Sequence, residues 1–228
     1  SPLLALLLRD RPEDVGLMKF GMNKVAADAA GGKPAEEGIS YAEVVRMPVF
    51  YALIVFAFIM MGCSTLNLFI PGFAENSGFS LEQASLAAAA SMAGVTLGKL
   101  LLGWINDRNC TAGLLISTIG GTVGLAAIVS ASSVLWVVLT GSFFFGWCYA
   151  GVTVQTAMLT RTVVGSRDYS RIFATVSVAL SAGGAVASGG WGLLADATSY
   201  SVIFITGASL LLIATLLGLY ALRPRPKH

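Results

Sequence analysis

Of the 228 residues, 56% are hydrophobic and only 11% are charged, and the net charge at pH 7 is +2. A soluble domain of this size would have about a quarter of its residues charged. The apolar residues also form long clusters, which excludes an ordinary soluble enzyme and a disordered chain, and the small net charge excludes nucleic acid as a partner. The composition therefore predicts an integral membrane protein.

The residues that usually hold metals or form disulfides are few. Cys63, Cys110 and Cys148 are scattered and form no CxxC pair, so we expect neither a disulfide framework nor a metal site. The single histidine is His228, the last residue, which removes the usual base from any catalytic proposal. The chain begins with Ser1 rather than Met and has no cleavable signal sequence, so we expect a fragment of a longer protein.

Residues 1–47 differ in character from the rest. Pro2 to Leu8 is apolar but too short to span a membrane, and we interpret it as the end of a preceding span. A polar linker follows, the central cytoplasmic loop, and then Ser40 and Glu43 have the capping-box spacing that begins a helix. We expect this helix to lie on the membrane surface.

Six long apolar stretches then follow one another, each close to the roughly 20 residues that cross a bilayer as a helix. They are Pro48 to Phe73, Leu81 to Ile105, Ala112 to Ala131, Val134 to Thr160, Ile172 to Ala195 and Ser201 to Leu222. Strands are not expected, because barrel strands are shorter and alternate apolar with polar residues. The sequence predicts an all-α membrane protein, a six-transmembrane-helix bundle over residues 48–222 with a tail at 223–228.

The basic residues indicate how this bundle is oriented. Six spans leave both chain ends on one side, and every Lys and Arg except Lys99 falls on that side. By the positive-inside rule, both ends are then cytoplasmic, in a plasma or inner membrane.

No enzyme motif is found. Gly94 to Lys99 superficially suggests a phosphate-binding loop, but it has one residue too few between its glycines, and Leu100 replaces the Ser or Thr that would bind magnesium. A membrane serine protease would need a histidine within the spans, and none is present. We therefore predict no enzymatic activity and no cofactor.

The most specific segment is the end of the second span, Gly98 to Arg108. Lys99, Gly103 and Asp107 are four residues apart, so they share one helix face. The segment resembles the G-x-x-x-D-R signature of the major facilitator superfamily, in the copy between helices eight and nine. The final glycine of that signature is absent here, since Asn109 follows Arg108.

Two other stretches agree with this family. Arg9 to Leu17 resembles the start of its central cytoplasmic loop, and Gly192 to Tyr200 resembles its turn between helices eleven and twelve. The resemblance covers essentially the whole chain and implies helices seven to twelve of a twelve-helix fold. It also implies a missing N-terminal six-helix half as a partner.

The resemblance implies alternating access, in which two halves rock around a central site. It assigns Gly103, Asp107 and Arg108 to a cytoplasmic gate. The carboxylate of Asp107 would meet the positive end of a helix and a nearby arginine, for which Arg161 is the candidate. Alternatively, Asp107 caps its own turn or lies in headgroup water.

Lys99 is the candidate for substrate binding. A lysine near the bilayer centre costs roughly 2.5–3.5 kcal/mol on insertion scales, which makes it a functional candidate. A cation facing an aqueous cavity binds an anionic group, most simply a carboxylate. The alternative is that the side chain snorkels toward the cytoplasmic interface.

The oxalate/formate and monocarboxylate transporters of this superfamily often have a basic residue at the place that matches Lys99. The fifth span has no second Lys or Arg between Thr175 and Trp191 to pair with a dianion. The resemblance therefore implies a singly charged, monocarboxylate-like organic anion.

Polar residues of other spans are candidates to line the same cavity, namely Asn67, Tyr149, Gln155 and Ser181. Each could instead form an interhelical hydrogen bond. None of the twelve acidic residues lies near the middle of a span, so any proton coupling would use the missing half.

The sequence thus predicts a secondary active or facilitative transporter of a small organic anion in the lipid bilayer. Two alternatives stay open. One is a transporter of an uncharged or cationic solute in which Lys99 is structural. The other is a membrane scaffold subunit that transports nothing.

Overall fold

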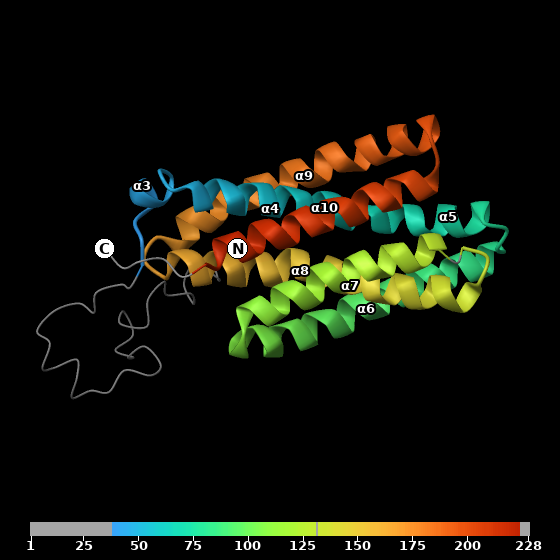
Figure 1. The fold of residues 1–228 in the computed structure, drawn as a ribbon, viewed down its shortest axis with the longest axis horizontal. Coiled ribbons are helices and arrows are strands. Elements are labelled where there is room, and N and C mark those ends of the chain that lie inside the picture. Colours follow the sequence, from blue (N-terminus) through green and yellow to red (C-terminus); the bar gives the residue numbers. More distant parts are fainter. Residues whose placement is uncertain (1–37, 131, 224–228) are drawn as a thin grey trace, which may run out of the picture. The chain divides into compact units, whose positions relative to one another are not determined.

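The computed structural model describes residues 38–130 and 132–223 of the chain. Within these ranges, six helical spans are long and apolar enough to cross a membrane, as predicted (Figure 1). The first span consists of α4 (Pro48–Ser64), the 3-10 segment η2 (Thr65–Phe69) and α5 (Ile70–Asn76). The other spans are single helices: α6 (Leu81–Arg108), α7 (Cys110–Ser130), α8 (Leu135–Val164), α9 (Tyr169–Ala197) and α10 (Tyr200–Ala221).

A one-turn helix, α3 (Tyr41–Val44), precedes the first span, and the predicted capping box at its start forms. The Ser40 backbone N–H and hydroxyl both donate to Glu43 Oε2, at 3.0 and 2.8 Å. Apart from an isolated pairing of Gly38 with Gly165, the described residues form no strand. The predictions for Pro2 to Leu8, for the linker up to residue 37 and for residues 224–228 lie outside the described residues.

Several helices extend past the apolar stretches that predicted them. For example, α6 continues to Arg108, α8 continues to Val164, and α9 begins at Tyr169. Helical hydrogen bonding continues into the polar headgroup layer, so hydropathy marks the width of the hydrocarbon core and not the helix ends.

Exposed arginines gather at one end of the bundle, which we name the basic end. This end contains the start of α4, the α6–α7 turn, the α8–α9 turn and the end of α10 (Figure 1). Its arginines are Arg46, Arg108, Arg161, Arg167, Arg171 and Arg223.

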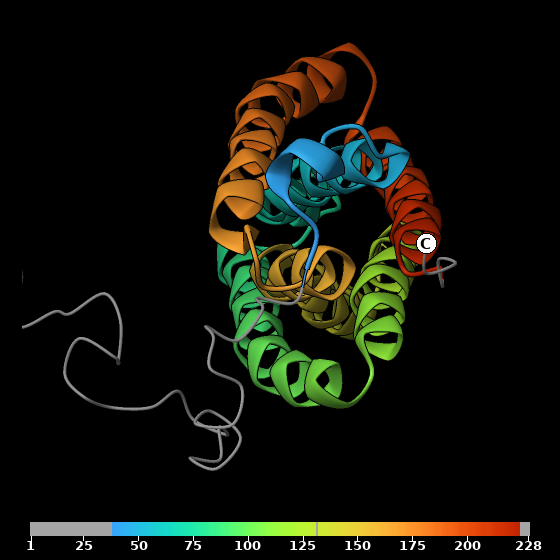
Figure 2. The same cartoon turned by 90° about the vertical axis from the view of Figure 1, so that its left-hand side faces the viewer.

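Helix α8 lies in the middle of the bundle, packed between α6 and α7 and also touching α4 (Figure 2). Glycines allow the close approach of α6 and α8. A Cβ on Gly94 would collide with the Phe143 carbonyl, and one on Gly146 would collide with the Ser91 carbonyl. Close backbone packing of this kind holds helices together in lipid, where apolar burial gives little drive for association.

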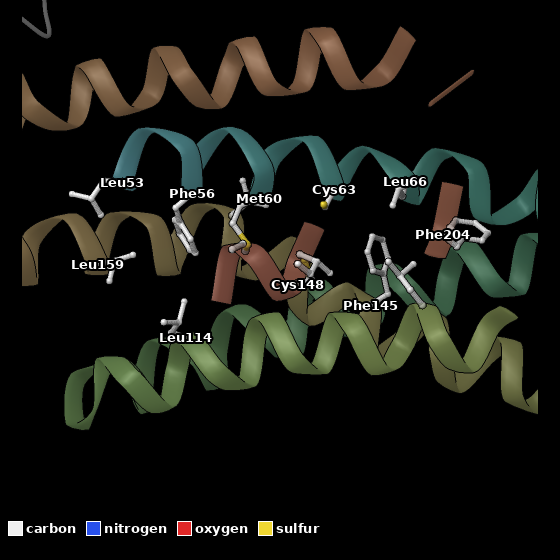
Figure 3. Close-up of a cluster of buried hydrophobic side chains, with 14 of the residues drawn as sticks. Leu53, Phe56, Met60, Cys63, Leu66, Leu114, Phe145, Cys148, Leu159 and Phe204 are labelled. Atoms are coloured by element: carbon white, nitrogen blue, oxygen red, sulfur yellow. The ribbon is translucent and has the colours of Figure 1, made fainter. Parts of the chain in front are cut away.

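The hydrophobic core is formed by side chains from α4, α7, α8 and α10 (Figure 3). Phe56, Met60, Leu114, Phe145 and Leu211 are all fully buried. The core thus joins the first span to the third, fourth and sixth.

The break in the first span was not predicted. Hydroxyl groups bond the carbonyls that lead into the break: Ser64 Oγ donates to Met61 O at 2.7 Å, and Thr65 Oγ1 donates to Gly62 O at 2.7 Å. The indole Nε1 of Trp191 in α9 also donates to Gly62 O, at 2.8 Å. Because Pro71 has no backbone N–H to donate to the residue four positions earlier, regular α-helical bonding cannot continue through this segment.

Candidate functional site

The exposed surface of α6 is divided into two faces. One is apolar and consists of Leu97, Leu100, Leu101 and Trp104, all exposed. The other, which we name the polar face, carries Thr96, Lys99, Gly103 and Asp107, spaced three or four residues apart. The apolar face suits lipid, whereas a face with a lysine and an aspartate does not.

Lys99 lies on the polar face nine residues before the end of α6, which is about 13 Å along the helix. Its neighbour Gly98 packs against Trp147 and Ala150 of α8. The Lys99 side chain is exposed and has no hydrogen-bond or ion-pair partner in the described part of the chain. Its ammonium group is therefore available to a partner from outside this bundle.

The predicted gate residues lie at the basic end but do not contact one another as expected. Among residues 38–130 and 132–223, Asp107 and Arg161 form no ion pair, and both are exposed. The guanidinium of Arg108 stacks on Trp104, 3.8 Å from the ring centroid. The cap of the following helix is provided by Asn109, whose Oδ1 accepts the Ala112 N–H at 3.1 Å. The carboxylate of Asp107 thus has no bond to any of the described residues.

Two of the predicted cavity residues instead connect helices. Gln155 is fully buried, and its Nε2 donates to the Cys110 carbonyl at 3.1 Å, joining α8 to the start of α7. Asn67, in η2, accepts a short hydrogen bond from the Ser91 hydroxyl of α6. An interhelical hydrogen bond was the alternative to a cavity position for both residues, and the structure shows that bond in each case.

Tyr149 and Ser181 lie on hydroxyl-rich sides of α8 and α9. Tyr149 is half-buried, and Thr153, one turn further on, is exposed. Ser181 is exposed, and its hydroxyl donates only to the Ser177 carbonyl of its own helix, at 3.1 Å. Within the described bundle, neither hydroxyl group therefore makes a hydrogen bond to another helix.

Three further polar residues of the spans were not predicted. Thr153 shares the side of Tyr149, and Ser188 shares that of Ser181 at a spacing of seven residues, a pattern that could have been found by helical periodicity. Asn106, by contrast, is buried against Gly113 of α7 and its Nδ2 donates to Leu102 O at 2.8 Å. Nothing in the local sequence distinguishes it from an exposed loop residue.

These features define a multi-pass membrane protein with polar positions within its spans. A family model described as the Major Facilitator Superfamily matches residues 52–228, and the chain belongs to that family. The predicted six-helix half of the major facilitator fold is thereby confirmed. The family is one of transporters, and the resemblance to its oxalate/formate and monocarboxylate branch stays a prediction from the sequence.

A solved structure shows the same fold. The structure is described as "In meso crystal structure of the POT family transporter PepTSo"; it is 18% identical to the chain, with a TM-score of 0.64. The match covers 79% of this chain and 39% of that one, so the chain spans well under half the length of that transporter. No curated protein matches the chain at a significant level.

Proposed function

We propose that the chain is the C-terminal half of a transporter that moves a small, singly charged organic anion by alternating access, with Lys99 as the anion-binding cation. The basic end is the cytoplasmic end by the positive-inside rule. The partner half is a second six-helix bundle, in keeping with the 39% of the solved transporter's length that this chain covers.

The observation that carries the proposal is the unpaired, exposed lysine on the polar face of α6. An ammonium group at that depth would be costly against lipid, but the apolar face of the same helix already provides a surface for lipid. The polar face therefore suits a water-filled cavity between the two halves. There, Lys99 would attract a carboxylate through a charge-assisted hydrogen bond.

Other residues have supporting roles in the proposal. Tyr149 and Ser181 provide hydroxyl groups that can bond the solute, since neither hydroxyl bonds another helix among the described residues. Asn67 and Gln155 join the site when the interhelical bonds described above open. At the gate, Gly103 and Arg108 flank Asp107, which pairs with Arg161 in the conformation that is closed at the basic end.

The experiment is tracer uptake into proteoliposomes by the complete transporter that contains this chain. A panel of labelled monocarboxylates (formate, acetate, lactate and pyruvate) is compared with neutral analogues of similar size. Lys99→Gln should lower monocarboxylate uptake at least tenfold, and Lys99→Arg should retain part of it. Arg223→Gln, which removes an exposed charge from the basic end, is the matched control and should leave uptake near the unmodified level.

The results separate the proposal from its alternatives. Equal monocarboxylate uptake by Lys99→Gln and the unmodified protein would refute the role of Lys99. Uptake of neutral analogues that is unaffected by Lys99→Gln would support an uncharged solute. A complete protein that takes up none of the panel, and whose thermal stability no solute changes, would support the scaffold alternative.

A further inference from the structure

The segment before the first span is attached to the turn between α8 and α9, more than 120 residues further along the chain. We name residues 38–46 the strap. The Ile39 N–H donates to the Val164 carbonyl at 2.9 Å, and Gly38 pairs with Gly165 as an antiparallel bridge. Gly38 has φ +149°, and a Cβ there would lie 2.7 Å from the Val164 carbonyl oxygen. Only glycine allows so close an approach in this backbone conformation.

Asp168 makes the second attachment. It occupies the N-cap position of α9, yet its side chain does not cap that helix. Instead, Oδ2 accepts the backbone N–H of Tyr41, the first residue of α3, at 2.8 Å. The Asp168 side chain thus joins the start of α3 to the start of α9.

The Tyr41 side chain makes the third attachment, along the first two turns of α9. Its hydroxyl lies 3.4 Å from Thr175 Oγ1, and the Arg171 guanidinium lies 4.4 Å from its ring centroid. On its other side, the ring packs edge-on against Phe50 of α4, with centroids 6.4 Å apart. One side chain therefore joins the strap, the start of α9 and the start of α4.

These contacts matter because α9 is the least buried of the spans. Its packing is mostly against α4, with little contact to α8 or α10. Near the basic end, Val176 of α9 is fully buried in a small cluster with Ala57 of α4. Figure 1 shows α3 at the same end of the bundle as the α8–α9 turn. The strap contacts therefore stabilise the start of a helix that otherwise packs mainly against α4.

We propose that the strap is a lock on the basic end of α9. When it is docked, the first turns of α9 are held against α4. When it is released, the basic end of α9 separates from α4 and the buried α4–α9 contact around Val176 opens. Its release needs no change at Lys99, because the strap contacts involve only the α8–α9 turn and the starts of α9 and α4.

The test measures access to the α4–α9 contact. Val176→Cys is introduced into the full chain in lipid nanodiscs, and its reaction with a small maleimide is followed by mass spectrometry of the peptide that carries it, so the three native cysteines stay in place. Asp168→Ala or Tyr41→Ala should speed labelling at least fivefold. Asp196→Ala, an exposed aspartate at the other end of α9, is the matched control and should leave the rate unchanged.

Two results would overturn the lock. The first is an unchanged labelling rate in both strap variants. The second is an equal increase in the Asp196→Ala control, which would indicate general loosening of α9. If Asp168→Ala does not fold, Tyr41→Phe still decides the matter, because it removes only the hydroxyl near Thr175. It should accelerate amide hydrogen exchange in the first two turns of α9, and unchanged exchange there would also contradict the proposal.

Discussion

Replacing Gly94 with alanine adds one methyl group at the closest contact between α6 and α8. The new Cβ would collide with the backbone carbonyl of Phe143, and no rotation of a side chain can relieve that contact. The two helices must move apart along the seam that Gly146 also forms. Overpacking of this kind costs about 1–3 kcal/mol, and a contact with rigid backbone belongs at the upper end.

Alanine is also the better helix former, by about 1 kcal/mol relative to glycine. The net expectation for Gly94→Ala is a loss of about 2 kcal/mol in the free energy of unfolding. Gly190 of α9 provides the matched control, because a Cβ there has no neighbour within 4 Å. Gly190→Ala should leave stability unchanged or raise it by up to about 1 kcal/mol.

The assay is reversible unfolding in mixed micelles with increasing SDS, followed by tryptophan fluorescence and by circular dichroism. The two variants should differ by about 2–3 kcal/mol, with Gly94→Ala the less stable. Equal stability of the two variants would refute the reasoning, since it would mean that α6 and α8 can separate by the width of a methyl group at no cost.

Hydrogen bonds from Ser40 hold the pKa of the Glu43 carboxyl below its ordinary value of 4.5, and Arg167 lowers it further. Because the folded pKa is the lower one, the capping box is fully formed above pH 4.5 and weakens as the pH falls through the folded pKa. Hydrogen exchange of the Ser40 amide should therefore accelerate in that pH range. The Glu43→Gln variant, which has no carboxyl group to titrate, should not show this acceleration. Trp191→Phe removes the indole bond to the break in the first span and should cost about 0.5–1.5 kcal/mol in thermal unfolding. Trp136→Phe, at a side chain that is 76% exposed, should cost close to nothing, and a similar loss in both variants would contradict the role given to the indole.

Features that depend on neighbouring residues could be predicted from the sequence, whereas contacts between residues far apart in the chain could not. The six spans follow from local hydropathy, and the shared face of Lys99 and Asp107 follows from helical periodicity, so both could be predicted. The attachment of Tyr41 to Asp168 could not, because the two residues are 127 positions apart and an aspartate at an N-cap position normally bonds its own helix.

The burial of Gln155 is a similar case. A glutamine within a span is consistent with a cavity or with an interhelical bond, and only the position of Cys110 on the neighbouring helix decides between them. The predicted pair of Asp107 with Arg161 likewise came from the resemblance to the family, whose cytoplasmic gate has such a pair, and not from the local sequence. In the described conformation the two side chains do not pair.

During synthesis, the first span leaves the ribosome long before α9 does. Trp191 lies 129 residues after Gly62, so at typical elongation rates the indole arrives roughly 10 s later. In that interval, the Gly62 carbonyl can accept the hydrogen bond from the Thr65 hydroxyl, because Thr65 lies in the same span. In a nascent chain that ends before Trp191, only local hydrogen bonds would therefore stabilise the break in the first span. The indole of Trp191 adds the last hydrogen bond to the Gly62 carbonyl when α9 has been made.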